Sequence, residues 1–400
     1  MADLLDKLHD VLALAANFDA GVARPLETVF ERMLGPTVAL IDGRRTLVFG
    51  SNNYFGLTFH PDVMAAAKDA LERYGSGTTG SRAANGTLAA HRELEEDLAR
   101  AFGRRHALVF TTGYQANLGM VSGLCGAADF VLLDNDCHAS LYDAARLSGA
   151  TILGFRHNSA ESLRQRLRRL PAGERNRLAV VEGLYSIQGD VAPLRELVDV
   201  CREEQAYLLV DEAHSIGAYG EHGRGCVEAQ GVADEVDFVV GTFSKALGGV
   251  GGFALSDHEA LKGIPLLARP YVFTASGGAA NIAGVRAALK VLMTDSTLAP
   301  RLWRAVHRLR DGLSALGYRI GPSVSPIVPV TIGDRNLTLR AWRTLLASGL
   351  YVNLILPPAC PPDSCLLRFS CSAAHTDTEV DEALALLGKV GRDLGILQVS

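Results

Sequence analysis

Short apolar runs alternating with helix-like segments fill the middle of the chain and restrict its fold more than any other feature. Strands that are apolar along their whole length are typical of a parallel sheet with helices on both faces. We therefore predict an α/β fold with a large, mostly parallel sheet. The six apolar runs lie at 107–110, 130–133, 151–155, 178–181, 207–210 and 238–240.

The pattern changes beyond about residue 276. Two long segments with helical periodicity follow, and then two strand-like runs enclose a shorter helical segment. This order predicts a smaller C-terminal α/β domain. Near the other end, residues 1–20 have the periodicity of an amphipathic helix, and alternation on both sides of Asp42-Gly43 predicts a hairpin. The predicted divisions are an N-terminal helix and hairpin arm at 1–50, a large domain at 51–285 and a C-terminal domain at 286–400.

Charge and cysteine content exclude several classes of function. The formal net charge is −5, so the basic surface that nucleic-acid binding requires is missing. The seven cysteines form no Cys-x-x-Cys pair, so we expect neither a metal site nor a disulfide framework and favour a reducing, cytoplasmic location. No apolar stretch approaches the ~18 residues of a membrane span, and charges interrupt the N-terminal segment, so we expect no integral membrane segment and no signal peptide.

Two short motifs at the ends of predicted strands carry the strongest chemical signal. They are Asp-Glu-Ala-His at 211–214 and Gly-Thr-Phe-Ser-Lys at 241–245. The first also occurs as the acidic box of some helicases. A nucleotide triphosphatase of that kind needs a Gly-x-x-x-x-Gly-Lys-Ser/Thr motif to bind phosphate, and the sequence has none. The motif pair therefore indicates a different chemistry.

Lys245 favours a pyridoxal phosphate (PLP) enzyme. It follows an apolar strand and precedes the glycine pairs at 248–249 and 251–252. Such a setting desolvates a lysine, which lowers its pKa and makes the amine a competent nucleophile. A PLP enzyme needs a lysine for a Schiff base and an acid that keeps the pyridine nitrogen protonated. Asp211 is the candidate for that acid, and His214 is placed to donate to the phenolic oxygen of the ring.

Two further segments can complete a cofactor site. Thr111, Thr112 and Gly113 lead from a predicted strand into a helix, where backbone N–H groups can bind a phosphate. His138 follows the next strand, where its imidazole can stack on a flat ring. Each segment also has a purely structural interpretation, as an ordinary strand-to-helix turn or as the first residue of a helix.

These motifs together resemble the α-oxoamine synthases, a family of fold-type I PLP enzymes, from about residue 51 to residue 375. Within that family the likeness is greatest to the soluble bacterial serine palmitoyltransferases, and Phe-Arg-His-Asn-Ser at 155–159 is part of it. The family segments are Ser-Asn-Asn-Tyr-Phe-Gly-Leu at 51–57, Thr-Gly-Tyr-Gln-Ala-Asn at 112–117, His-Ala-Ser at 138–140, Glu-Gly-Leu-Tyr-Ser at 182–186, Asp-Val-Ala-Pro-Leu at 190–194, Asp-Glu-Ala-His-Ser at 211–215 and Gly-Thr-Phe-Ser-Lys at 241–245.

The resemblance implies a fold-type I transferase fold and a role for each matching residue. Thr274 and Ala275 match a segment that reaches the phosphate from the other subunit, which implies a homodimer with a shared active site. The implied catalytic residues are Lys245, as carrier of the cofactor and later base at the substrate Cα, with His138, Asp211 and His214. The implied cofactor-binding residues are Gly113, Tyr114, His138, Ser186, Asp211, His214, Thr242, Ser244, Lys245, Thr274 and Ala275. The implied substrate-binding residues are Asn52, Asn53 and Arg368.

The implied reaction joins an amino acid to an acyl-CoA with loss of CO₂. With L-serine and palmitoyl-CoA the product is 3-ketodihydrosphingosine, and the reaction is the first step of sphingolipid synthesis. The alternatives are family members that use glycine or alanine with another acyl thioester, such as 2-amino-3-ketobutyrate ligase or 8-amino-7-oxononanoate synthase, and a fold-type I aminotransferase.

Two positions depart from the palmitoyltransferase pattern. Leu356 stands where those enzymes have an arginine before Pro-Pro-Ala, here at 357–359. Gly277 and Gly278 stand where the family usually has an apolar residue followed by two prolines. Either change can mark a relative that uses another amino acid or another acyl thioester.

Overall fold

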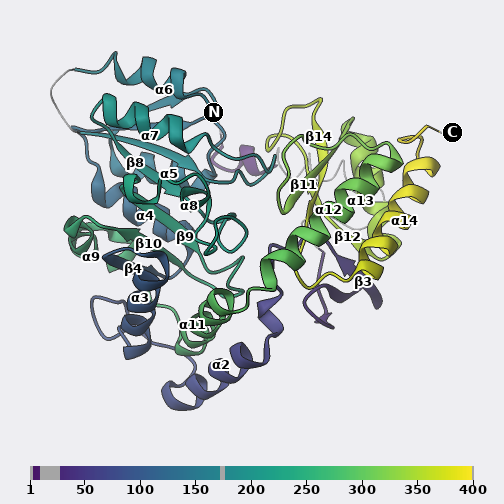
Figure 1. Cartoon of the computed structure of the whole chain (residues 1–400), viewed down its shortest axis with the longest axis horizontal. Coiled ribbons are helices and arrows are strands. Elements are labelled where there is room, and N and C mark those ends of the chain that lie inside the picture. Colours follow the sequence, from purple (N-terminus) through teal and green to yellow (C-terminus); the bar gives the residue numbers. More distant parts are fainter. Residues whose placement is uncertain (1–2, 10–27, 172–175, 399–400) are drawn as a thin grey trace.

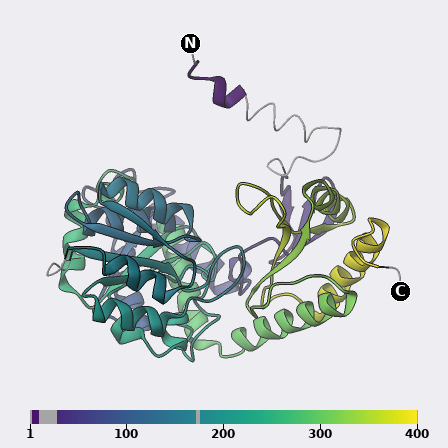
Figure 2. The same ribbon diagram turned by 90° about the horizontal axis from the view of Figure 1, so that it is seen from above.

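The computed structural model describes residues 3–9, 28–171 and 176–398. Residues 28–171 and 176–398 form two lobes (Figures 1 and 2). The larger lobe contains a seven-stranded sheet with the order β4-β10-β9-β8-β7-β5-β6. Strands β6, β5, β7, β8 and β9 are parallel, and β10 runs antiparallel to both neighbours. The prediction of a mostly parallel sheet is therefore confirmed. The strands are β4 (His106–Phe110), β5 (Phe130–Asp134), β6 (Thr151–Phe155), β7 (Arg177–Glu182), β8 (Tyr207–Asp211), β9 (Phe238–Thr242) and β10 (Gly252–Ser256).

Continuous apolar runs place the central strands inside this lobe. Every residue of β7 and β9, and all of β8 beyond its first residue, is buried. Each of the six predicted runs falls within one of the strands β4 to β9. The seventh strand, β10, is absent from the prediction because its start at Gly252 is hidden in the glycine-rich segment after Lys245.

Helices join these strands and cover the sheet (Figure 2). Thr112 and Ser159 begin two of them, because each side-chain oxygen accepts a hydrogen bond from the amide three residues on, at 3.1 and 3.2 Å. The helices of this lobe are α2 (Pro61–Tyr74), α3 (Ala89–Phe102), α4 (Gly113–Leu124), α5 (Ala139–Ser148), α6 (Ala160–Leu167), α7 (Leu194–Glu203), α8 (Cys226–Ala229), α9 (Ile264–Leu267), α10 (Arg269–Val272) and α11 (Ala279–Thr294).

The smaller lobe is the predicted C-terminal α/β unit. Its antiparallel sheet has the order β11-β14-β13. Within the described part of the chain, no helix has both the length and the apolar character that crossing a bilayer requires. The elements of this lobe are α12 (Leu298–Leu316), β11 (Ile327–Gly333), α13 (Arg335–Ala347), β12 (Leu350–Tyr351), β13 (Asn353–Ile355), β14 (Cys365–Ser370) and α14 (Asp377–Asp393).

The predicted hairpin is present as β2 (Val38–Ile41) and β3 (Arg44–Val48). Between them Asp42 and Gly43 have φ values of 50° and 69°, as a two-residue turn of type I′ requires. Of the predicted N-terminal helix, residues 10–20 lie outside the described residues.

A four-stranded sheet of order β1-β2-β3-β12 joins the N-terminal hairpin to a strand of the smaller lobe. Strand β1 is Arg32–Met33. Strand β12 pairs with β3 in parallel, with Leu350 opposite Leu47. The hairpin therefore shares a sheet with the C-terminal lobe. The division at 1–50, 51–285 and 286–400 stays a prediction.

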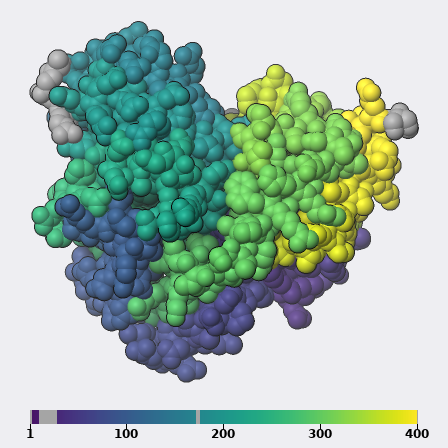
Figure 3. Space-filling view, viewed as in Figure 1, coloured from purple at the N-terminus to yellow at the C-terminus, as the bar shows by residue number. Residues whose placement is uncertain are grey.

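The two lobes lie directly against each other (Figure 3). Hydrogen bonds cross between them: Tyr219 Oη donates to the carbonyl of Val324 at 3.1 Å, and Trp303 Nε1 to that of Ala218 at 3.0 Å. The smaller lobe can therefore contribute side chains to a site at the edge of the large sheet.

Candidate active site

A cavity of about 320 Å³ opens at the carboxyl ends of β7, β8 and β9, beside the first turns of α4 and α5. Ligands of open α/β sheets bind at this edge. A larger cavity, of about 1200 Å³, lies between α2, α3 and α11 and contains none of the predicted site residues. The smaller cavity brings together eight of them: Gly113, Tyr114, His138, Asp211, His214, Thr242, Ser244 and Lys245.

Lys245 follows β9 and is half-buried at the wall of this cavity. Desolvation lowers the pKa of Lys245 to about 8, although the negative charges of Asp211 and Glu182 oppose the shift. A much larger fraction of this amine is neutral near pH 8 than of an exposed lysine. Lys245 is therefore suited to act as a nucleophile or a base.

Asp211 ends β8 and is a buried carboxylate. Its Oδ2 accepts a hydrogen bond from Asn117 Nδ2 at 2.7 Å, and its Oδ1 accepts one from the amide of Ala213 at 2.9 Å. Among the described residues it forms no ion pair. A buried carboxylate is stabilised by a positive partner, so this position fits a protonated ring nitrogen.

His214 is buried, and its Nδ1 lies 2.7 Å from Tyr54 Oη. Burial and the charge of Lys245 hold the pKa of His214 well below its usual value, so the ring is neutral. Burial raises the pKa of Tyr54 to about 12, so its phenol keeps its proton. When Tyr54 donates to Nδ1, the ring proton of His214 is on Nε2, where it can donate to an oxygen.

A chain of hydrogen bonds connects Asp211 to His138. Asn117 in α4 donates one amide hydrogen to Asp211 and the other to Ser140 Oγ, at 2.9 Å. Ser140 Oγ in turn lies 2.7 Å from His138 Nδ1. The amide of Ser140 also donates to Nδ1, at 3.2 Å, so Nδ1 is an acceptor. The Ser140 hydroxyl therefore donates to Nδ1, and the ring proton of His138 is on Nε2. The His138 side chain is exposed and lines the cavity.

Glu182 also fixes His138, although no role for it is predicted from the sequence. It ends β7 opposite Asp211 on β8, and its Oε1 accepts a hydrogen bond from the His138 amide at 2.5 Å. Burial and the charge of Asp211 raise the pKa of Glu182, while Lys245 opposes the shift. Asn117 was missed as well. Its signal was its position four residues after Gly113, on the same face of α4.

The first turn of α4 forms the candidate phosphate site. A Cβ on Gly113 would lie 2.8 Å from the Cβ of Thr242, so only glycine fits between the helix and β9. Thr112 accepts from the amide of Gln115, which leaves the amides of Gly113 and Tyr114 available to an anion. Thr242 Oγ1 lies 2.9 Å from Ser244 Oγ beside them. The Tyr114 hydroxyl donates to Asp143 instead.

Thr274, Ala275 and Ser186 do not line this cavity. Thr274 Oγ1 accepts from Gln115 Nε2 at 3.0 Å, and the carbonyl of Ala275 accepts from Thr111 Oγ1 at 2.6 Å. Their loop therefore lies beside the first turn of α4. The carbonyl of Ser186 accepts from Arg368 Nε at 2.6 Å.

Arg368 extends from β14 of the smaller lobe and is buried. Its Nη1 donates to Ser370 Oγ at 2.8 Å, and both Nη atoms lie 3.3 Å from Asn52 Oδ1. No carboxylate among the described residues neutralises it. Asn53 differs from Asn52, because its Nδ2 donates to Thr58 Oγ1 at 2.8 Å. The pair Arg368 and Asn52 therefore offers a positive site for a carboxylate.

Comparisons with known proteins agree with this geometry. Residues 44–387 match the family model of class I and II aminotransferases. A serine palmitoyltransferase of Caulobacter vibrioides is 50% identical over 376 residues, which cover 94% of this chain and 93% of the relative. One of Sphingomonas paucimobilis is 46% identical over 99% of this chain and 94% of the relative. A solved serine palmitoyltransferase with PLP as an internal aldimine superposes with a TM-score of 0.97, at 45% identity, covering 99% of this chain and 100% of that structure.

Proposed function

The chain belongs to the class I and II aminotransferase family and, within it, to the α-oxoamine synthases, and on this premise we propose that it is a serine palmitoyltransferase. It condenses L-serine with palmitoyl-CoA and releases CoA and CO₂. The product is 3-ketodihydrosphingosine, in the first step of sphingolipid synthesis. The observation that carries the proposal is the cavity in which Lys245, Asp211, His214 and His138 meet.

PLP is the cofactor, and the residues of the cavity fit it. The buried carboxylate of Asp211 forms no ion pair with any residue that the structure describes, and the amides of Gly113 and Tyr114 face an anion site. Lys245 would hold the cofactor covalently, and His214 Nε2 would donate to its phenolic oxygen. When bound, PLP withdraws electrons from the substrate Cα and so acidifies the Cα–H bond.

The chain itself supplies the proton transfers and the orientation of the substrate. The free amine of Lys245 would take the proton from the substrate Cα at Nζ, and its lowered pKa suits that task. His138 would stack on the ring, with its Nε2–H available to the substrate carboxylate. Arg368 and Asn52 would bind the same carboxylate from the smaller lobe.

A homodimer with a shared active site is part of the proposal. Three large apolar side chains are exposed next to the loop of Thr274 and Ala275: Leu266 at 83%, Leu267 at 68% and Phe273 at 74%. Such a group of exposed apolar side chains is typical of a surface that contacts another protein.

All seven cysteines are free, which supports the proposed reducing, cytoplasmic location.

Two departures from the palmitoyltransferase pattern, Leu356 and the pair Gly277 and Gly278, bear on which amino acid the enzyme prefers. Leu356 is half-buried in the loop before β14. A Cβ on Gly278 would meet only the carbonyl of Ser76, at 3.6 Å, and one on Gly277 only Ile282, at 3.1 Å. Neither glycine is at a positive φ. The backbone conformation at these two positions does not require glycine, and nothing in the structure explains why both residues are glycine.

Titrating the holoenzyme with L-serine, L-alanine and glycine tests this preference. We expect L-serine to change the absorbance of the cofactor at lower concentration than either other amino acid, as the similarity to serine palmitoyltransferases implies. Arg368 and Asn52 would bind the carboxylate that all three amino acids share, so this pair does not distinguish between them. CoA release should then require both L-serine and palmitoyl-CoA. A response to alanine or glycine, with none to serine, would support another α-oxoamine synthase instead.

A further inference from the structure

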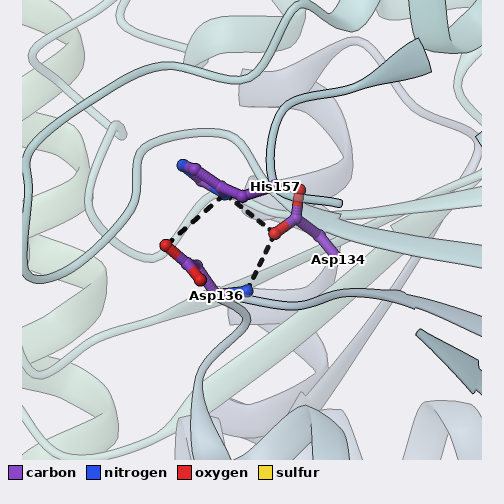
Figure 4. Close-up of side chains that lie close together, drawn as sticks. All are labelled: Asp134, Asp136 and His157. Carbon is purple, nitrogen blue, oxygen red and sulfur yellow. Dashed lines mark hydrogen bonds and ion pairs between the residues drawn. The ribbon is translucent and has the colours of Figure 1, made fainter. Parts of the chain in front are cut away.

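Three residues with ligand-type side chains lie together at the carboxyl ends of β5 and β6: Asp134, Asp136 and His157 (Figure 4). His157 Nδ1 lies 2.8 Å from Asp134 Oδ1 and 3.8 Å from Asp136 Oδ2. Its Nε2 lies 2.7 Å from Asp190 Oδ2, in the loop after β7. Each ring nitrogen therefore needs a hydrogen to bond its carboxylate, and His157 is an imidazolium with no lone pair for a metal ion.

The surroundings of His157 keep it charged. Burial lowers the pKa of His157, but the hydrogen bonds and negative charges of Asp134 and Asp190 outweigh this and raise the pKa to about 10. Tyr185 packs edge-on against the ring, with centroids 4.4 Å apart. The pKa of His157 exceeds the usual ~6.5 of an exposed histidine, so its charged form stabilises the folded state. This contribution to stability is complete below about pH 6.5 and is lost as the pH rises through about 10.

One carboxylate partner of His157 leads to His138. Asp134 Oδ1, which contacts the imidazolium, also accepts from the amide of Asp136 at 2.9 Å. Asp136 lies in the turn that ends at His138, where α5 begins. His157 therefore stabilises this turn through Asp134.

The other partner leads to Arg368. The amide of Tyr185 donates to the carbonyl of Asp190 at 2.9 Å and so closes the loop that contains Ser186. Ser186 in turn accepts the hydrogen bond from Arg368 Nε. His157 therefore connects the turn that ends at His138 to the loop in which Ser186 contacts Arg368. His138 and Arg368 are the two side chains proposed to bind the substrate carboxylate.

We propose that His157 is a positioning residue for the amino acid: it fixes His138 and the Ser186 loop relative to each other and so sets the affinity for the substrate carboxylate. This inference rests on the proposed function. It assigns no contact between His157 and the substrate.

The variant His157→Gln tests the proposal in the holoenzyme. Glutamine has no positive charge, and its single amide nitrogen cannot occupy the positions of both ring nitrogens, which contact Asp134 and Asp190 separately. We expect the Kd for L-serine, followed by cofactor absorbance, to rise about tenfold, while the KM for palmitoyl-CoA and the bound PLP stay unchanged. Equal loss for both substrates, or no loss for serine, would overturn the proposal. His222→Gln is the matched control, since His222 also binds a carboxylate, that of Glu228, but is exposed and lies away from the site.

Two further measurements keep the test decisive. Nitrogen-15 NMR of the histidine rings at pH 8 should show both ring nitrogens of His157 protonated. An unprotonated ring nitrogen would contradict the assignment of His157 as an imidazolium. If His157→Gln does not fold, Asp190→Asn removes only the charge on the Ser186 side and should give the same selective loss of serine affinity. A wild-type enzyme that does not respond to serine would refute the proposed function. A normal wild type with unaffected variants would refute only this inference.

Discussion

Replacing Lys245 with alanine should lower kcat for the condensation of L-serine with palmitoyl-CoA about 10³-fold or more. The side chain has two tasks in the proposed reaction, as the covalent attachment point of the cofactor and as the base at the substrate Cα, and a positioned base alone contributes roughly 10²–10⁴-fold. Asp211 and Glu182 line the same cavity, so its wall stays polar when the Lys245 side chain is removed. The assay is CoA release at saturating concentrations of both substrates.

The matched control for this variant is Lys262→Ala. Lys262 is an exposed lysine whose contact is with Glu259, three residues earlier, so its loss should leave kcat within the error of the wild type. Both variants should unfold at temperatures close to that of the wild type. If Lys245→Ala keeps a third or more of the wild-type kcat, the proposed role of Lys245 is wrong.

Replacing Asp211 with asparagine should lower kcat about 10²-fold or more, because a neutral amide cannot stabilise a positive charge on the ring nitrogen. The substitution keeps the size of the side chain, and an amide oxygen can still accept from Ala213 or Asn117. The loss should therefore appear in kcat, with a smaller change in the KM for palmitoyl-CoA. Initial rates over a range of both substrates measure this division.

Asp199→Asn is the control for the loss of a negative charge. Asp199 is half exposed and pairs only weakly with Arg195, at 3.8 Å, so its removal should not change the rate. If Asp211→Asn is as active as this control, the proposed pairing of Asp211 with the cofactor is refuted. If it fails to retain PLP but turns over normally with added PLP, Asp211 acts in binding alone.

The large sheet could be predicted well because its strands are apolar along their whole length. A run such as 178–181 leaves no other arrangement than burial on both faces. Strand β10 and the pairing of β12 with β3 could not be predicted in this way. The first begins within a glycine-rich segment, and the second depends on residues about 300 positions apart that meet only in the folded chain.

The candidate site could be predicted where each residue ends a strand or lies in the turn after one, as Asp211, His138 and Lys245 do. Glu182 and Asn117 were missed, although both lie in motifs that the sequence analysis singled out. The sheet order places β7 beside β8, and this order is not visible in the sequence. Arg368 was implied only by the family resemblance, since its contact with Ser186 crosses between the two lobes.

The most direct test of the central claim uses L-serine labelled at its carboxyl carbon. Incubated with the holoenzyme and palmitoyl-CoA, the label should leave as CO₂ in a one-to-one ratio with released CoA, and 3-ketodihydrosphingosine should accumulate in the same amount. If CoA is released while the carboxyl label stays in the product, or if serine is consumed without release of CoA, this chain does not catalyse decarboxylative acyl transfer to serine.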